Sequence, residues 1–315
     1  MAAKKRPTQE TPARPQHGGR SVHRVVFVTG KGGVGKSAVA AATALQMARQ
    51  GQRVLLVELG SRSFYGPLLG LQVGSDAVPW RPGVTIARWD VESSLREYLG
   101  HYLVFKLAAE KILNNTIMKA LVAAAPSLAE LALLGRVMAP MRHAWYRRDV
   151  DVVVVDAYAT GQFMALLRAP RGLAQTAASG PMHSQSVGLT RLLSDAAICE
   201  YRLVTLAEEL PIAEACEMAA GILAETGVAP RVYCNRMLDL AAWLPALPAT
   251  DLAAPFVAAM VRIAAHQHEG LAALDALGRS RAGPVCRLPL VPTLDAGAML
   301  EALTDALDAA AGVSA

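Results

Sequence analysis

The sequence of 315 residues contains no run of about twenty consecutive uncharged apolar residues, which is the length that a membrane-spanning helix needs. Its first residues are basic but are followed by no apolar core, which argues against a secretory signal. The few cysteines have neither the spacing of metal ligands nor that of a redox motif. They are Cys199, Cys216, Cys234 and Cys286. We therefore expect a cytoplasmic protein with reduced, buried thiols.

Charge is also scarce and is concentrated at one end of the chain. Charged residues make up 18% of the sequence and hydrophobic residues 53%, as in a globular protein with a sizeable core. The net charge is +5, and residues 1–20, with five basic side chains and one acidic one, carry +4 of it. We interpret residues 1–21 as a disordered basic tail, with a membrane or nucleic-acid contact as the alternative. The near-neutral remainder gives no reason to expect a nucleic-acid partner.

In residues 22–315, short β-branched runs alternate with long stretches rich in alanine and leucine. Continuous apolar strands separated by helices are typical of parallel sheets that are buried on both faces. The pattern predicts an α/β fold with a doubly wound, mostly parallel sheet. The strands are expected at residues 24–29, 53–58, 84–87, 152–156, 202–206, 231–234 and 285–290.

A segment at about 93–148, between the third and fourth expected strands, has an almost wholly helical pattern. We interpret it as a helical insertion into a single domain. It contains Met118, Met138 and Met141 among many leucines. Flexible methionine side chains suit an adaptable binding surface, but they also suit a helical layer packed against the sheet. Both interpretations remain open at this point.

The segment between the first strand and the first helix fits the phosphate-binding pattern G-x-x-x-x-G-K-[ST]. Its residues are Gly30, Lys31, Gly32, Gly33, Val34, Gly35, Lys36 and Ser37. The glycines allow the loop to curl so that backbone N–H groups face phosphate oxygens, and the helix adds its N-terminal dipole. We expect Lys36 to reach the β- and γ-phosphates of ATP and the Ser37 hydroxyl to hold Mg²⁺.

A four-valine run ends in Asp156. A carboxylate at the end of a strand beside the phosphate-binding loop is suited to hold a water bound to Mg²⁺, as a Walker B acid does. We therefore predict Ser37 and Asp156 as the metal-binding residues. The turn at residues 157–162 contains a glycine and is a candidate sensor of the γ-phosphate.

The loop K-G-G-V-G-K-S, with Lys31 at its start, resembles the deviant Walker A motif of the SIMIBI class of P-loop NTPases. Within that class the chain resembles the ArsA family, which includes the arsenical-pump ATPase and the tail-anchored-protein targeting ATPase. Residues 156–162 are similar to its D-A-P-x-T-G-H switch II, and residues 204–214 to its V-T-x-P-E-x-L-P-x-x-E segment. Further similar segments are residues 89–99, 126–137, 235–237 and 288–292.

The resemblance implies a dimer that sandwiches ATP between its subunits. Lys31 would cross the interface to the partner's phosphates and offset charge in the transition state. Together with Lys36 and Asp156 it would form the catalytic set. Asn235 would hydrogen-bond the adenine, and Glu208 would approach the nucleotide from the other subunit. The alternative for Asn235 is an ordinary turn residue at the end of a strand.

The chain also departs from the family pattern. The family has an aspartate in switch I that orients the attacking water, but residues 58–63, Glu58-Leu-Gly-Ser-Arg-Ser63, contain none. Glu58 is a candidate substitute that lies one or two residues early. Switch II has Tyr158 in place of proline and Gln162 in place of histidine. The C-x-x-C zinc motif and clustered cysteines for arsenite are absent, which argues against arsenite transport.

The sequence therefore favours an ArsA-like dimeric ATPase that uses ATP and Mg²⁺ as a switch for a protein client or membrane partner. The missing aspartate favours a hydrolytically weak subunit, either in a homodimer or paired with an ArsA-like paralogue. One alternative is a positioning ATPase of the MinD/ParA type, although residues 295–310 are acidic and not basic as a membrane anchor would be. Another is a non-catalytic ATP-binding module.

Overall fold

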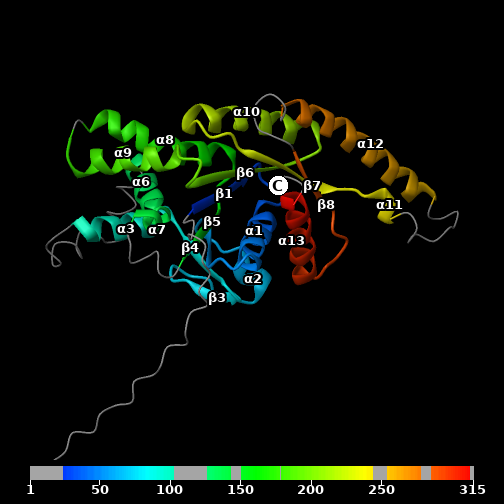
Figure 1. Ribbon diagram of the computed structural model, residues 1–315, viewed down its shortest axis with the longest axis horizontal. Coiled ribbons are helices and arrows are strands. Elements are labelled where there is room, and N and C mark those ends of the chain that lie inside the picture. The colour runs from blue at the N-terminus through cyan, green and yellow to red at the C-terminus, as the bar shows by residue number, and fades with distance from the viewer. Residues whose placement is uncertain are drawn as a thin grey trace, which may run out of the picture.

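The computed structural model describes residues 24–102, 126–142, 150–177, 179–243, 254–277 and 285–312 (Figure 1). In these ranges one sheet of eight strands has the order β3-β4-β2-β5-β1-β6-β7-β8. The strands are β1 (Arg24–Gly30), β2 (Val54–Leu59), β3 (Val78–Arg81), β4 (Val84–Trp89), β5 (Val152–Asp156), β6 (Cys199–Leu206), β7 (Arg231–Met237) and β8 (Cys286–Pro289). All neighbours are parallel except β3 and β4. The predicted α/β fold is confirmed.

The strands at the centre of the sheet are apolar on both faces because helices cover both sides. Strand β5 lies between β2 and β1, and its four valines are fully buried. In the registers of these pairs, Asp156 stands opposite Val28 of β1 and Glu58 of β2. The sheet therefore brings the end of the valine run to the edge where β1 ends.

Helices form a layer on each face of the sheet (Figure 1). They are α1 (Lys36–Arg49), α2 (Tyr65–Leu69), α3 (Val91–Tyr102), α6 (Pro126–Val137), α7 (Ala139–Arg142), α8 (Thr160–Thr176), α9 (Pro181–Leu193), α10 (Glu209–Thr226), α11 (Leu240–Trp243), α12 (Ala254–Leu277) and α13 (Ala296–Gly312). One buried cluster packs α1 and α13 against one face. A second cluster packs α6, α8, α9 and α10 against the other.

The part of the predicted helical insertion that the structure describes consists of α3, α6 and α7. Met138 and Met141 are buried in the core cluster beside α8, so these two methionines belong to a packed layer. Met118 and the predicted tail at residues 1–21 lie outside the described residues.

The sequence reasoning missed one strand, the antiparallel edge strand β3. Its sequence, Val-Pro-Trp-Arg, contains a proline, which cannot donate a hydrogen bond to a ladder and is tolerated at the edge of a sheet. Among the described helices, none has the length and apolar character that crossing a membrane requires.

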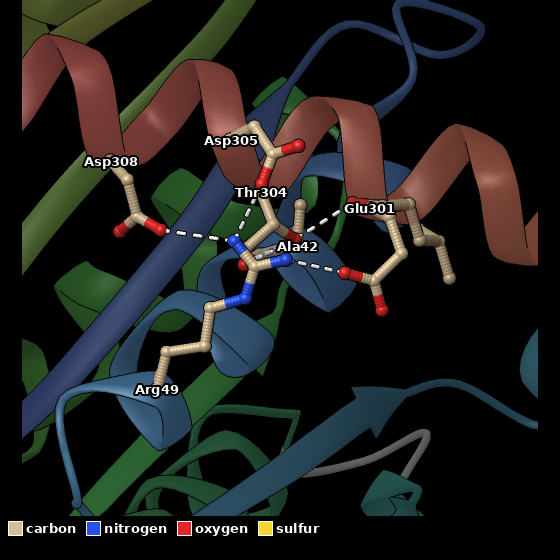
Figure 2. Close-up of polar contacts among 7 residues, drawn as sticks. Ala42, Arg49, Glu301, Thr304, Asp305 and Asp308 are labelled. Carbon is tan, nitrogen blue, oxygen red and sulfur yellow. Dashed lines mark hydrogen bonds and ion pairs between the residues drawn. The ribbon is translucent and has the colours of Figure 1, made fainter.

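The last described helix, α13, is attached to α1 by a charged contact (Figure 2). The Arg49 guanidinium donates hydrogen bonds to Asp305 (2.7 Å), Asp308 (3.1 Å) and Glu301. Leu300, Leu303 and Leu307 are buried beneath these acids. Acidic residues that alternate with leucines at helical spacing therefore give α13 one face for the core and one for Arg49.

Candidate nucleotide-binding site

The loop between β1 and α1 requires glycine at both of its ends. Gly30 has φ +146°, and a Cβ atom there would lie 2.1 Å from the Val204 carbonyl oxygen of β6. Gly35, the residue before α1, has φ +91°, and its Cβ would lie 2.4 Å from Asn235 Nδ2. A positive φ and a close neighbour both exclude larger residues. The two glycines thus fix the curl of the loop that the sequence predicts.

The middle of the loop and the start of α1 are open to a ligand. Gly32 and Gly33 are exposed, and no side chain caps the N-terminus of α1. Helix N-termini with free N–H groups favour anions such as phosphate. Lys36 leans back over the loop, where its Nζ donates to the Lys31 carbonyl oxygen (3.1 Å). Burial lowers the Lys36 pKa, while the Asp156 carboxylate opposes this shift.

Asp156 is buried beside the loop, as the sequence predicts, and it lies close enough to Ser37 for that side chain to lower its pKa. Burial raises the pKa of Asp156 to about 6, although the contacts with Ser37, Tyr65 and Lys36 act in the opposite direction. A hydroxyl and a carboxylate in contact are the hard oxygen donors that Mg²⁺ prefers. Ser37 and Asp156 therefore fit the role of metal-site residues.

Tyr65 is a site residue that the sequence reasoning missed. It is fully buried, and its hydroxyl lies 2.8 Å from the Ser37 carbonyl oxygen and 3.1 Å from Asp156 Oδ2. Burial raises its pKa well above the usual value of 10, so the phenol keeps its proton. No spacing pattern in residues 59–71 distinguishes this tyrosine from a residue of the core, so its role emerges only from the fold.

Glu58, the candidate substitute for the switch I aspartate, lies inside β2 and is buried. Both of its carboxylate oxygens accept hydrogen bonds from the segment that follows the strand. The Ser63 hydroxyl donates to Oε2 (2.7 Å), and the Phe64 backbone N–H donates to Oε1. In this arrangement Glu58 anchors the segment, and one acceptor site on each of its carboxylate oxygens is used within the chain.

Lys31 is paired within its own chain. Its Nζ lies 2.6 Å from Glu214 Oε1 on α10, and both side chains are about one-third exposed. The lysine at the start of the loop is therefore held toward α10. The pairing partner lies in the 204–214 segment that the sequence analysis had singled out, although Glu214 itself had no predicted role.

Asn235 lies within β7, and Glu208 follows the end of the neighbouring strand β6 by two residues. The buried amide of Asn235 donates to the Val34 carbonyl oxygen (2.9 Å) and accepts from the Arg236 backbone N–H (2.9 Å). Asn235 therefore supports the phosphate loop directly. Glu208 is exposed at the residue before α10, and its side chain does not cap that helix.

The turn after Asp156 is bound to β1 and borders a cleft. The Thr29 hydroxyl donates to the Tyr158 carbonyl oxygen (2.9 Å), which connects the candidate sensor turn to the strand that carries the loop. Tyr158 and Gln162 line a cleft of about 790 Å³ together with Arg88 of β4, Arg96 of α3 and Asp90 between these two elements. The phosphate loop, the metal-site pair and this turn share the carboxyl edge of the sheet, where ligands of open α/β sheets bind.

A glycine loop of this geometry between a buried parallel strand and a helix, with a strand-end carboxylate beside its serine, defines a P-loop nucleotide-binding protein. Comparison with known proteins gives the family. Residues 23–179 match the family model described as anion-transporting ATPase. The match identifies this region of the chain, just under half of its length, with the ArsA family.

Two kinds of curated relative illustrate the match. ATPase BagA of Mycobacterium tuberculosis is 34% identical over 206 residues, which cover 62% of this chain and 59% of the relative. The arsenical pump-driving ATPases of Acidiphilium multivorum and Escherichia coli are 29% and 27% identical, with 52% of this chain and 28% of each relative covered. The chain thus spans less than two thirds of the length of these relatives.

Proposed function

We propose that this chain binds ATP with Mg²⁺ and hydrolyses it as an ArsA-type ATPase, as a nucleotide-driven switch for a protein client or membrane partner. The observation that carries this proposal is the placement of Ser37 and the buried Asp156 at the open end of the glycine loop, where both lie within hydrogen-bonding distance of the Tyr65 hydroxyl. Mg²⁺ would be held by these two residues and would neutralise charge on the transferred phosphoryl group.

The residues of the chain have separate tasks in this reaction. The exposed N–H groups of Gly32 and Gly33 and the start of α1 receive the phosphates. Lys36, which now bonds to the carbonyl oxygen of Lys31, exchanges this neutral acceptor for phosphate oxygens. A charged acceptor forms the stronger hydrogen bond, so Lys36 binds phosphate in preference to the carbonyl oxygen.

The proposed dimer assigns a second state to Lys31. In the single chain its ammonium group is paired with Glu214, and the pair is partly exposed. When two subunits enclose ATP, Lys31 leaves Glu214 for the partner's phosphates, and the exposed Glu208 approaches the partner's nucleotide. The separation of a partly exposed ion pair costs on the order of 1 kcal/mol or less, which contacts with a triphosphate readily offset.

The geometry of Glu58 favours slow hydrolysis by this chain alone. Both of its carboxylate oxygens accept hydrogen bonds from the segment after β2, which holds the carboxylate in place, and residues 59–63 offer no other acid. Orientation of the attacking water would then depend on a second subunit. We therefore propose either a slow homodimer or a heterodimer with an ArsA-like paralogue that supplies complete switch residues.

The test is nucleotide binding and ATP turnover of the purified full-length chain, with Lys36→Ala as the control variant. We expect binding of Mg²⁺-ATP that Lys36→Ala weakens by about 100-fold or more, and turnover well below about 1 per second. The absence of Lys36-dependent binding would overturn the proposal. Rapid turnover without a partner would overturn the weak-subunit part alone, whereas tight binding with no turnover, even beside a paralogue, would favour a non-catalytic ATP-binding module.

A further inference from the structure

Tyr65 touches both halves of the candidate metal site. Its hydroxyl lies 2.8 Å from the main-chain oxygen of Ser37 and 3.1 Å from Oδ2 of Asp156. A phenol carries one proton, so it donates fully to only one of these two acceptors at a time. The hydroxyl is therefore a donor that can turn toward the carboxylate or away from it without leaving its place in the core.

A chain of hydrogen bonds from the end of β2 holds Tyr65 in this position. Glu58 accepts from the Ser63 hydroxyl (2.7 Å) and from the backbone N–H of Phe64. The Ser63 hydroxyl accepts from the Gly66 backbone N–H (2.9 Å), which closes the turn on the far side of Tyr65. The backbone on both sides of Tyr65 is thus held near the end of β2. The Tyr65 side chain itself is buried in the core.

A second buried tyrosine shows what a purely structural hydroxyl looks like in this fold. Tyr201 lies in the core cluster on the opposite face of the sheet, and its hydroxyl donates to the Leu193 carbonyl oxygen (2.7 Å). This contact completes the packing of β6 and involves no site residue. Tyr65 differs because one of its two acceptors is the carboxylate expected to hold the metal.

The geometry points to Tyr65 as a positioning residue for the metal-site carboxylate Asp156. This inference rests on the proposed Mg²⁺-ATP function. Through Tyr65, the segment after β2 acts on the metal site by a phenol hydroxyl. The hydroxyl holds Oδ2 of Asp156, which would leave the other oxygen of this carboxylate for the metal site. Outer-shell partners of this kind typically change metal affinity by about 10- to 100-fold.

The experiment compares Tyr65→Phe with Tyr201→Phe in the full-length chain, because each variant removes one buried hydroxyl. Binding of Mn²⁺ in the presence of ATP is measured by electron paramagnetic resonance, ATP binding is measured in EDTA, and the melting temperature is measured for both variants. We expect Tyr65→Phe to weaken Mn²⁺ binding by about 10-fold or more. Its metal-free ATP binding should stay within about twofold of wild type, and Tyr201→Phe should leave Mn²⁺ binding unchanged while lowering the melting temperature.

Equal Mn²⁺ affinity in wild type and Tyr65→Phe, or an equal loss in both variants, would overturn the inference while leaving the proposed function intact. Failure of the wild-type chain to bind Mn²⁺ with ATP would overturn both. If Tyr65→Phe does not fold, Ser63→Ala gives the answer, because it loosens only the turn that aims Tyr65. This variant should weaken Mn²⁺ binding by about threefold, and an unchanged affinity would again overturn the inference.

Discussion

The two ends of helix α1 are built in opposite ways. At its N-terminus, Gly35 has a left-handed backbone, no side chain caps the helix, and exposed glycines precede it. At its C-terminus, Arg49 binds three carboxylates of α13 (Figure 2). The N-terminal end leaves backbone N–H donors available to a ligand. At the C-terminal end, the charge of Arg49 is paired with carboxylates of the same chain. One helix thus carries both a binding end and a stabilising end, and substitutions at each end separate these roles.

The largest effect is expected for Gly35→Ala. A methyl group there meets the Asn235 amide at 2.4 Å on a backbone of φ +91°, so the loop must open or the amide must leave Val34. Titration with a fluorescent ATP analogue should show a loss of affinity of about 100-fold or more. Gly227→Ala at the end of α10 is the control, since it has a similar positive φ of +74° but nothing lies within 4 Å of its added Cβ. Equal losses in the two variants would contradict the steric explanation.

Asp156→Asn should separate stability from binding. The pKa of Asp156 is raised from 3.8 to about 6, so the folded chain loses stability relative to the unfolded chain as pH rises from about 4 to about 6. At pH 7 the neutral amide removes this penalty of roughly 3 kcal/mol, and the nucleotide-free chain should melt several degrees higher. Mg²⁺-dependent turnover should fall by about 100-fold or more.

Asp151→Asn is the control, because Asp151 lies just before β5 and its carboxylate is paired with Arg53 (2.7 Å). This substitution removes a favourable charge, so the melting temperature should fall. A lower melting temperature in both variants would show that the carboxylate of Asp156 stabilises the nucleotide-free fold.

Glu214→Gln should change ATP affinity less than Gly35→Ala does, and it should raise the affinity where Gly35→Ala lowers it. It frees Lys31 from a partly exposed ion pair worth on the order of 1 kcal/mol or less. Affinity for Mg²⁺-ATP should therefore rise by up to about fivefold, measured by the same titration. Glu217→Gln on α10 removes the same charge from an exposed position and serves as the control. A similar rise in both variants would mean that net charge, and not the release of Lys31, is responsible.

The smallest effect is expected for Arg49→Met at the other end of α1. The ion pairs are substantially exposed, so their loss should cost on the order of 1 kcal/mol and lower the melting temperature by a few degrees. High salt should reduce the difference between variant and wild type. Affinity for the ATP analogue should stay unchanged. A change in affinity would show that the two ends of the helix are coupled.

Much of this arrangement follows from local sequence. The valine run predicts a buried parallel strand, and the glycine pattern predicts a loop between β1 and α1, because both depend on residues that are neighbours in the chain. Placement of Asp156 beside Ser37 also follows, since the carboxyl ends of parallel strands share one edge of the sheet.

Contacts between distant segments could not be predicted in this way. Lys31 meets Glu214, and Asn235 meets Val34, across separations of 183 and 201 residues. Tyr65 and the anchoring role of Glu58 depend on how the segment after β2 folds back, and no spacing rule describes such a turn. The edge strand β3 was missed because Pro79 interrupts the pattern, although the edge of a sheet tolerates proline.

The attachment of α13 has a consequence for how the chain folds during synthesis. Contacts between α1 and α13 join residues that are 256 and 262 positions apart. At about 5 to 20 residues per second, the ribosome needs on the order of ten to fifty seconds to make the intervening chain. During that interval the face of α1 that packs against the leucines of α13 stays uncovered. The nascent chain therefore carries an uncovered apolar face on α1 until α13 has emerged.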